Sequence, residues 1–372
     1  MRDIILPLGP LSVVTGAGGT GKSSIYKALR LLADVADDRI IESIAQEGGF
    51  DSVLWAGPES ISKAMRDGSV PIQGTVRRDR VALKLGFADE DIAYAIELGL
   101  PGQDSTSLFN RDPEIKRETL WTGLKPTPSK IIADRHGPRM AAKRGAKTAN
   151  HSAISVASHQ SMIREFVGAH APWEVSVLRQ KLSAWRFYDH MRTDTSAPSR
   201  GAQIGTRTVA LSVDGGNIAA AIQTIYEIGD GSVLDAAIDT AFPGARLKVT
   251  GADGVFRLSM QQRGMLRPLN AAELSDGTLR FIMLAAALLS PRPAPLLVLN
   301  EPESSLHSST LPALASLIVT ASQDSQLVVV SHNRLLVTSL LDSDAELIEL
   351  YKDAGETFVQ GDDLSRWHWP KR

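Results

Sequence analysis

The feature that most constrains this chain is the segment Gly16–Ser23, which reads GAGGTGKS and matches the pattern G-x-x-x-x-G-K-[ST] in full. An apolar run over residues 11–15 precedes it, and apolar residues at helical spacing follow it. Strand, glycine-rich loop and helix is the order in which this pattern binds phosphate. The alternative, a chance match in a Gly-rich turn, does not account for the flanking strand and helix. We therefore expect a P-loop within an α/β fold.

The loop supplies the candidate nucleotide-binding residues. Its glycines let the backbone turn tightly and point N–H groups at an anion, and the dipole of the following helix favours the same charge. Lys22 is expected to reach the β- and γ-phosphates, and the Ser23 hydroxyl to ligate Mg²⁺. ATP and Mg²⁺ are the predicted ligands. The residues expected to hold the phosphates are Gly16, Gly18, Gly19, Thr20, Gly21, Lys22, Ser23 and Ser24.

Composition narrows the class of protein. With 372 residues and 43% hydrophobic content, the chain can build one large globular domain or two. A formal net charge of −2 does not suggest an obligate polyanion binder, and the absence of cysteine excludes disulfides, thiolate catalysis and Cys-based zinc sites. The longest apolar segment, residues 281–289, is far shorter than the roughly 20 residues that span a bilayer. We expect a cytoplasmic protein with no membrane segment.

A second chemical signal lies at residues 273–278, ELSDGT, which lead into the apolar segment 279–289. The length and Ala/Leu content of that segment predict a buried helix. At its start, Ser275 and Gly277 would present a hydroxyl group, backbone N–H groups and a positive dipole end to an anion. The alternative for Ser275 is an ordinary helix cap.

Two apolar strands are each predicted to end in polar residues. Residues 295–299 lead into Asn300 and Glu301, and residues 326–330 lead into Ser331 and His332. Buried parallel strands leave their last side chains at the carboxyl edge of the sheet, where ligands of open α/β sheets bind. There Glu301 could accept a proton from the water attacking the γ-phosphate, and His332 could hold that water or donate to a phosphate oxygen. The alternatives are a surface acid at a strand end and a structural histidine.

The rest of the chain predicts ordinary elements and one basic stretch. Residues 135–144 hold several Arg and Lys residues and look like a loop, either solvated or in contact with phosphate or DNA. Aromatic residues within 185–190 indicate core packing. The expected hairpins are 81–85 with 92–98 and 246–249 with 255–260, and the expected helices are 161–170, 175–190, 218–228, with Asn217 as its N-cap, and 233–242.

In this order, the P-loop, LSDGT, LVLNEPE and VVVSH resemble the ATPase heads of the ABC, SMC and RecF superfamily, especially the compact bacterial RecF-like or SMC-like AAA family ATPases. The resemblance implies a P-loop NTPase with an ABC-type head, a mixed sheet with an antiparallel flank and a mainly helical insertion. In that family two heads bind ATP between one P-loop and the partner's signature turn. Carried over, Ser275 and Gly277 contact the γ-phosphate in trans, Glu301 is the general base and His332 is the switch histidine.

The sequence departs from the family pattern in places that bear on activity. Asn300 stands where the Mg²⁺-linked aspartate is expected, so it keeps a carbonyl ligand but lacks the charge. His307 occupies the position of the D-loop aspartate, and Thr278 that of the usual signature Gln or Lys. Weaker Mg²⁺ binding or slow turnover would follow from Asn300.

Our prediction is an ATPase that forms an ATP-dependent homodimer and acts on DNA or a companion protein, in DNA repair or phage defence. The alternative is a switch that binds ATP without hydrolysing it and reports it to a partner protein. The expected domains are residues 1–135 and 206–372, which together form the head, and a helical insertion over 136–205.

Overall fold

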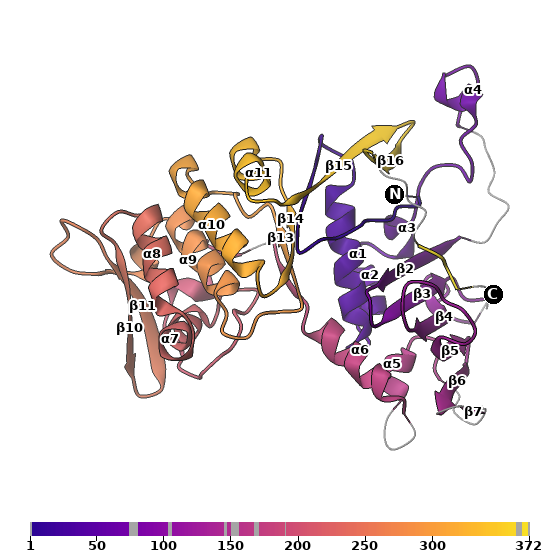
Figure 1. Cartoon of the computed structure of the whole chain (residues 1–372), viewed down its shortest axis with the longest axis horizontal. Helices are drawn as coiled ribbons and strands as arrows, with labels where there is room; N and C mark the ends of the chain where they lie inside the picture. The colour runs from indigo at the N-terminus through magenta and orange to yellow at the C-terminus, as the bar shows by residue number, and fades with distance from the viewer. Residues whose placement is uncertain are drawn as a thin grey trace. The chain divides into compact units, whose positions relative to one another are not determined.

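The computed structural model describes residues 2–73, 81–102, 106–144, 147–149, 156–166, 171–189, 191–361 and 367–370. The chain forms two compact units, each assembled from separate segments (Figure 1). The first contains residues 1–6, 18–184 and 350–372, and the second contains 7–17 and 185–349. The units therefore do not follow the expected boundaries at 135 and 205. No helix among the described residues has the length and hydropathy to span a membrane.

A parallel sheet lies at the centre of the second unit. Its strands run in the order β15, β1, β14, β13, β8, and the far end of β15 continues into the first unit. The last four are parallel, with Val13 of β1 opposite Val329 of β14 and Val328 opposite Val298 of β13. Their apolar runs are typical of strands buried on both faces. The bounds are β1 (Leu11–Gly16), β8 (Arg186–Tyr188), β13 (Leu296–Asn300), β14 (Gln326–Val330) and β15 (Glu346–Asp353).

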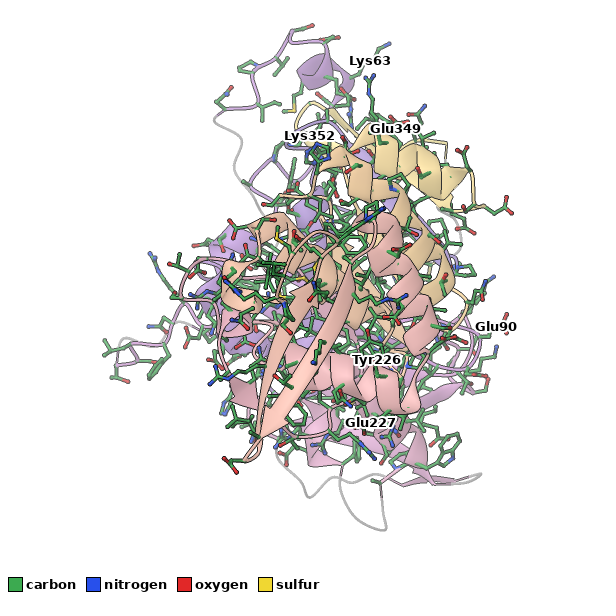
Figure 2. The ribbon with its side chains drawn as sticks, turned by 90° about the vertical axis from the view of Figure 1, so that its left-hand side faces the viewer. Lys63, Glu90, Tyr226, Glu227, Glu349 and Lys352 are labelled. Carbon is green, nitrogen blue, oxygen red and sulfur yellow. The ribbon has the colours of Figure 1, made fainter. Side chains whose placement is uncertain are left out.

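Helices and a second sheet complete the core of this unit. Helix α9 is buried at every residue from Leu279 to Leu288, which places it at the centre of the core, as its composition predicts. The other helices are α7 (Ile218–Ile228), α8 (Gly231–Ala241), α9 (Asp276–Leu288), α10 (Leu311–Ala321) and α11 (Arg334–Leu341), with 3₁₀ turns η1 (Pro198–Arg200), η2 (Ala271–Glu273) and η3 (Ser308–Thr310). The antiparallel sheet holds β9 (Gln203–Ile204), β10 (Arg246–Ala252), β11 (Val255–Gln261) and β12 (Leu269–Asn270). Figure 2 faces its long hairpin, with Tyr226 and Glu227 of α7 labelled beside it.

The first unit is built around an antiparallel sheet and the helix that follows the P-loop. The sheet runs in sequence order from β2 to β7, namely β2 (Ala82–Ala88), β3 (Ala93–Gly99), β4 (Glu114–Trp121), β5 (Ile131–His136), β6 (Arg139–Arg144) and β7 (Lys147–Ala149). The helices are α1 (Lys22–Val35), α2 (Ile40–Gln46), α3 (Phe50–Val53), α4 (Lys63–Arg66), α5 (Met162–Glu165) and α6 (Trp173–Ser183). Strand β16 (Glu356–Val359) pairs with the end of β15.

Most of the expected elements are confirmed. Both hairpins form, with residues 82–88 paired to 93–99 and 246–252 paired to 255–261. Helices α7 and α8 and the strands before Glu301 and His332 lie where the sequence places them. Trp185 and Tyr188 are buried, as core packing requires. Asn217 takes the N-cap position of α7, although its side chain accepts from the Ser212 N–H rather than from the helix.

The basic stretch 135–144 was wrongly predicted to be a loop. It is the end of β5 and the strand β6, which form a hairpin across His136 and Arg139. The strand pattern of alternating buried and exposed residues is hidden in the sequence because the charged Arg135 points into the core. There its Nη1 lies 3.0 Å from Oε2 of Glu118, and both side chains are 0% exposed. An arginine that is paired with a buried carboxylate is a core residue, whereas a cluster of charged residues in the sequence suggests a surface segment.

Two predicted helices are shorter than expected. The helix predicted over 175–190 ends at Ser183, and residues 186–188 form β8 along β13. Arg-Phe-Tyr favours strand once a neighbouring strand is present to pair with it. The helix predicted over 161–170 is α5, which ends at Glu165 because Phe166 is extended. Residues 167–170 and His190 lie outside the described residues. Segment 136–205 holds strands as well as α5 and α6.

Candidate nucleotide site

The carboxyl edge of the parallel sheet in the second unit gathers the predicted catalytic segments. Strands β1, β14 and β13 are neighbours, with Val330 opposite both Val14 and Asn300. Beyond these pairs, the Ser331 N–H donates to the Val14 carbonyl at 3.1 Å, and the Glu301 N–H donates to the Val330 carbonyl at 2.8 Å. The start of the P-loop, the His332 segment and the Glu301 segment therefore leave the sheet side by side.

Glu301 and His332 face each other at this edge. His332 Nδ1 lies 3.4 Å from Glu301 Oε1, and the two side chains are 61% and 44% exposed. The Glu301 backbone has φ of 48°, in the left-handed region that is costly for a residue with a side chain. Strain of this kind is found at functional sites, where the surrounding structure holds it. Both side chains are accessible to a water molecule or a phosphate.

Glu303 is a third side chain at this edge, and the sequence predicted no role for it. Glu303 is buried, with a side chain 5% exposed, and its Oε1 accepts from Ser331 Oγ at 2.6 Å and from the His332 N–H at 3.3 Å. Its Oε2 is buried with no hydrogen-bond partner among the described residues. Glu303 thus ties the end of β13 to the end of β14. The sequence signal was the second acid of Glu-Pro-Glu, two residues after the proposed base.

Arg280 connects helix α9 to the same edge. Its Nη2 donates to the carbonyl oxygens of Glu301 and Asp189, each at 3.2 Å. Burial lowers the pKa of the Arg280 guanidinium, and the carboxylates of Glu303, Asp189 and Glu301 partly oppose this shift. One arginine within the otherwise apolar segment 279–289 was the sequence signal for this contact.

The glycine-rich loop continues from the end of β1 into the first unit, where α1 begins at Lys22. Gly21 is the N-cap of α1 with φ of 103°, a conformation that glycine adopts without strain. Gly18 and Gly19 are exposed, and a Cβ atom built on either meets nothing within 4 Å. The first turn of α1 carries no acidic residue, and no side chain caps it. The loop therefore presents an open cradle and a helix N-terminus, which fit a phosphate chain.

The other predicted phosphate-binding residues are one buried residue of the loop and two exposed residues at the start of α1. Thr20 is buried, and its carbonyl oxygen accepts from Thr357 Oγ1 of β16 at 2.8 Å, so it holds the loop rather than opening onto solvent. Ser23 and Ser24 are exposed on the first turn of α1. No group of three or more His, Asp or Glu residues in the described parts of the chain could hold a metal ion.

The turn predicted to act as the signature lies at the start of α9. Ser275 is the exposed N-cap residue, and its Oγ accepts from the Thr278 N–H at 3.1 Å. Ser275 Oγ also lies 2.8 Å from Thr278 Oγ1, and either hydroxyl group can donate in that pair, so the Ser275 hydrogen can turn to an anion when Thr278 donates. A Cβ atom at Gly277 would stand 2.6 Å from the Ser305 carbonyl oxygen, so only glycine fits there. His307, which the resemblance aligns with the D-loop aspartate, caps η3 by accepting from the Ser309 N–H at 3.2 Å.

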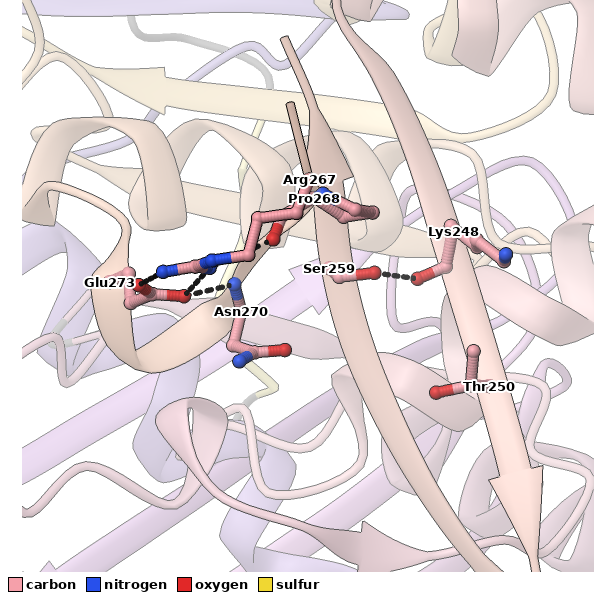
Figure 3. A pocket seen from close by; sticks show the side chains of 7 residues that line it. All are labelled: Lys248, Thr250, Ser259, Arg267, Pro268, Asn270 and Glu273. Carbon is pink, nitrogen blue, oxygen red and sulfur yellow. Dashed lines mark hydrogen bonds and ion pairs between the residues drawn. The ribbon is translucent and has the colours of Figure 1, made fainter. Parts of the chain in front are cut away.

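The turn before Ser275 is closed by its own ion pair, shown in Figure 3. Arg267 Nη1 and Nη2 donate to the two oxygens of Glu273 at 2.8 and 2.7 Å, and Glu273 Oε2 accepts from the Asn270 N–H. The hydrogen bonds from Arg267 and Asn270 lower the pKa of the Glu273 carboxyl to about 2. These residues line a hollow of about 420 Å³ with Lys248, Thr250, Ser259 and Pro268.

Comparison with known proteins bears on the family and the fold. The sequence matches the family described as "AAA domain, putative AbiEii toxin, Type IV TA system" over residues 11–338. Among curated proteins, none matches this chain. The solved Smc head bound to the C-winged helix domain of ScpA is 13% identical, with 95% of this chain and 91% of that chain covered and a TM-score of 0.51. The SMC head domain from Thermotoga maritima is 13% identical over the same shares, with a TM-score of 0.41. The expected P-loop NTPase fold of the SMC head type is confirmed.

Proposed function

This chain belongs to the AAA ATPase family that it matches over residues 11–338, and from that membership we propose that two copies join around ATP and hydrolyse it. The observation that carries the proposal is the parallel register of β1, β14 and β13. It brings the beginning of the P-loop, His332 and Glu301 to one edge of a sheet. Ligands of open α/β sheets bind at such an edge.

Within one subunit, the loop and the strand ends would divide the work on ATP. Backbone N–H groups of Gly18–Gly21 and the ammonium group of Lys22 hold the β- and γ-phosphates. The Ser23 hydroxyl and the Asn300 carbonyl oxygen would be the protein's ligands for Mg²⁺, which would neutralise phosphate charge. The Glu301 carboxylate accepts a proton from the attacking water, and His332 Nε2 or Nδ1 orients that water or a γ-phosphate oxygen.

The second subunit would supply the signature turn. Ser275 Oγ and the N–H groups at the start of α9, including that of Gly277, donate to the γ-phosphate of the ATP held by the other copy. The exposure of Ser275 supports this role, because a turn that acts on a partner's ligand has to be accessible. A single copy then holds incomplete sites, and dimerisation depends on ATP.

Phosphate release tests the enzymatic part. The parent protein is expected to release phosphate from ATP with Mg²⁺, and Glu301→Gln to abolish it while ATP still binds. Glu349→Gln, an exposed acid labelled in Figure 2, is the matched control and should keep the parent rate. Lys22→Ala should lose nucleotide binding altogether. A Glu301→Gln protein that turns over ATP at the parent rate would contradict the role of Glu301.

Asn300 favours a second candidate function, a switch that binds ATP without hydrolysing it. An amide oxygen lacks the charge that usually holds Mg²⁺ at this strand end. Under this candidate, the parent protein binds ATP and dimerises but releases no phosphate, and Glu301→Gln behaves like the parent. The same phosphate assay therefore separates the two.

We propose DNA or a companion protein as the partner on which the dimer acts, in DNA repair or phage defence. The basic stretch gives DNA less support than its charge suggests, because Arg135 is buried against Glu118. Affinity for duplex DNA should fall steeply with added salt if phosphate contacts carry it. If the affinity for DNA does not fall with added salt, a companion protein is the remaining proposed partner.

A further inference from the structure

Arg200 makes an unusual set of contacts with the turn that precedes α9. Its side chain is 11% exposed. Its Nη1 donates to the carbonyl oxygens of Leu274 at 2.8 Å and of Ala271 and Ala272 at 3.2 Å each, and its Nη2 donates to Asp276 Oδ1 at 2.6 Å. The guanidinium therefore holds residues on both sides of Ser275.

The segment that carries Arg200 is itself held by hydrogen bonds. Arg200 Nε donates to the Thr193 carbonyl at 2.8 Å, and Arg200 ends the 3₁₀ turn η1. The side chain of Gln203 joins that turn to α7, since its Nε2 donates to the Pro198 carbonyl at 3.2 Å and its Oε1 accepts from the Ala219 N–H at 2.8 Å. The arginine thus extends from an anchored segment.

The contacts act on the shape and on the charge of the signature turn. The carbonyl groups of η2 have no helical partners beyond the turn, and the guanidinium satisfies them in one arrangement. Asp276, 61% exposed on the first turn of α9, would repel an incoming phosphate, and the Arg200 charge offsets it. An anion at Ser275 therefore meets a fixed hydroxyl and a balanced charge.

We propose that Arg200 is the positioning residue of the signature turn: it holds Ser275 in the geometry that captures the ATP bound by the other subunit. This inference rests on the proposed dimer, and it concerns only the face that a copy offers to its partner. Binding of ATP to the P-loop of the same copy does not involve Arg200.

Dimerisation in a Glu301→Gln background tests this directly. The protein concentration for half-dimerisation at saturating ATP and Mg²⁺ is measured by light scattering, and the affinity of the monomer for a fluorescent ATP analogue is measured at low protein concentration. Arg200→Ala should raise the former by about tenfold or more and leave the latter within about twofold. Arg200→Lys should resemble Arg200→Ala, because one ammonium group cannot reach all the carbonyl oxygens. Arg207→Ala, which removes an exposed arginine of the same unit, is the control.

The outcomes separate this inference from the proposed function. If Glu301→Gln alone stays monomeric at saturating ATP, the proposed function fails. If it dimerises and Arg200→Ala dimerises at the same concentration, or Arg200→Lys restores full dimerisation, the carbonyl clamp is overturned.

Mixed dimers show that the effect is exerted across the interface rather than through folding. Lys22→Ala destroys its own P-loop but offers an intact signature turn, whereas Arg200→Ala has the opposite defect. Their mixture should contain one complete site per mixed dimer and release phosphate well above the sum of the two variants alone. Ser275→Arg mixed with Lys22→Ala is the reference. If the reference pair recovers activity and the Arg200→Ala pair does not, Arg200 is a purely structural residue and the inference is wrong.

Discussion

Replacement of Glu303 tests whether the buried carboxylate holds the carboxyl edge of the parallel sheet. Glu303→Ala removes the acceptor of the Ser331 hydroxyl, which is fully buried, and of the partly buried His332 N–H. Glu303→Gln keeps an oxygen that can accept from Ser331 but loses the negative charge. Asp324→Ala changes an exposed acid in a turn of the same unit and is the matched control.

The magnitude follows from the contacts. A buried donor that loses its acceptor costs about 1–3 kcal/mol, and a hydrogen bond to a charged group contributes about 1.5–3 kcal/mol. The free oxygen of Glu303 offsets part of this, because a carboxylate buried without full pairing is itself unfavourable. We expect Glu303→Ala to lower the free energy of unfolding by about 3 kcal/mol and Glu303→Gln by about 1 kcal/mol.

Urea unfolding measures the difference. With an m-value of about 2–3 kcal/mol per M, Glu303→Ala should move the midpoint of the transition that includes the second unit by about 1–1.5 M. Hydrogen exchange of the peptide over residues 326–333 should accelerate in the same variant, which locates the loss at β14. If Glu303→Ala unfolds at the same urea concentration as Asp324→Ala, the reasoning about Glu303 is refuted.

Three further predictions concern other parts of the structure. Glu118→Ala leaves the buried guanidinium of Arg135 without its carboxylate and should cost about 3–5 kcal/mol in urea unfolding; a loss below about 1 kcal/mol would contradict a buried pair. Gly277→Ala puts a Cβ atom against the Ser305 carbonyl oxygen, so we expect lost ATP-dependent dimerisation with ATP binding retained, and an unchanged dimer would speak against the close approach. Burial raises the pKa of Tyr188 to about 12, so the folded state keeps its proton longer than the unfolded state, and stability should fall by about 2 kcal/mol from pH 10 to pH 12. In Tyr188→Phe that fall should be smaller by this amount, and an equal fall would refute the assignment.

The sequence predicts most of what surrounds the site because its signals are local. Continuous apolar runs specify β1, β13 and β14, and turns rich in Asp or Gly, at residues 89–91 and 251–254, specify the two predicted hairpins. The polar residues that end those strands could be placed at one edge, since parallel strands share their carboxyl edge. Helix α9 follows from its Ala/Leu content.

What the sequence does not reveal depends on long-range pairs. The end of strand β5 could not be predicted from the charge pattern, because the charge of Arg135 is paired with Glu118, 17 positions earlier. The role of Glu303 depends on Ser331, 28 positions later, and that of Arg200 on carbonyl groups more than 70 positions away. Only the folded chain brings these groups together.

ATP is expected to join two copies of this chain, and the mass of the Glu301→Gln protein in solution tests this most directly. Light scattering should give 40.0 kDa without nucleotide and twice that mass with saturating ATP and Mg²⁺, and Lys22→Ala in the same background should stay at the monomer mass. A Glu301→Gln protein that binds ATP and remains at the monomer mass would contradict the account.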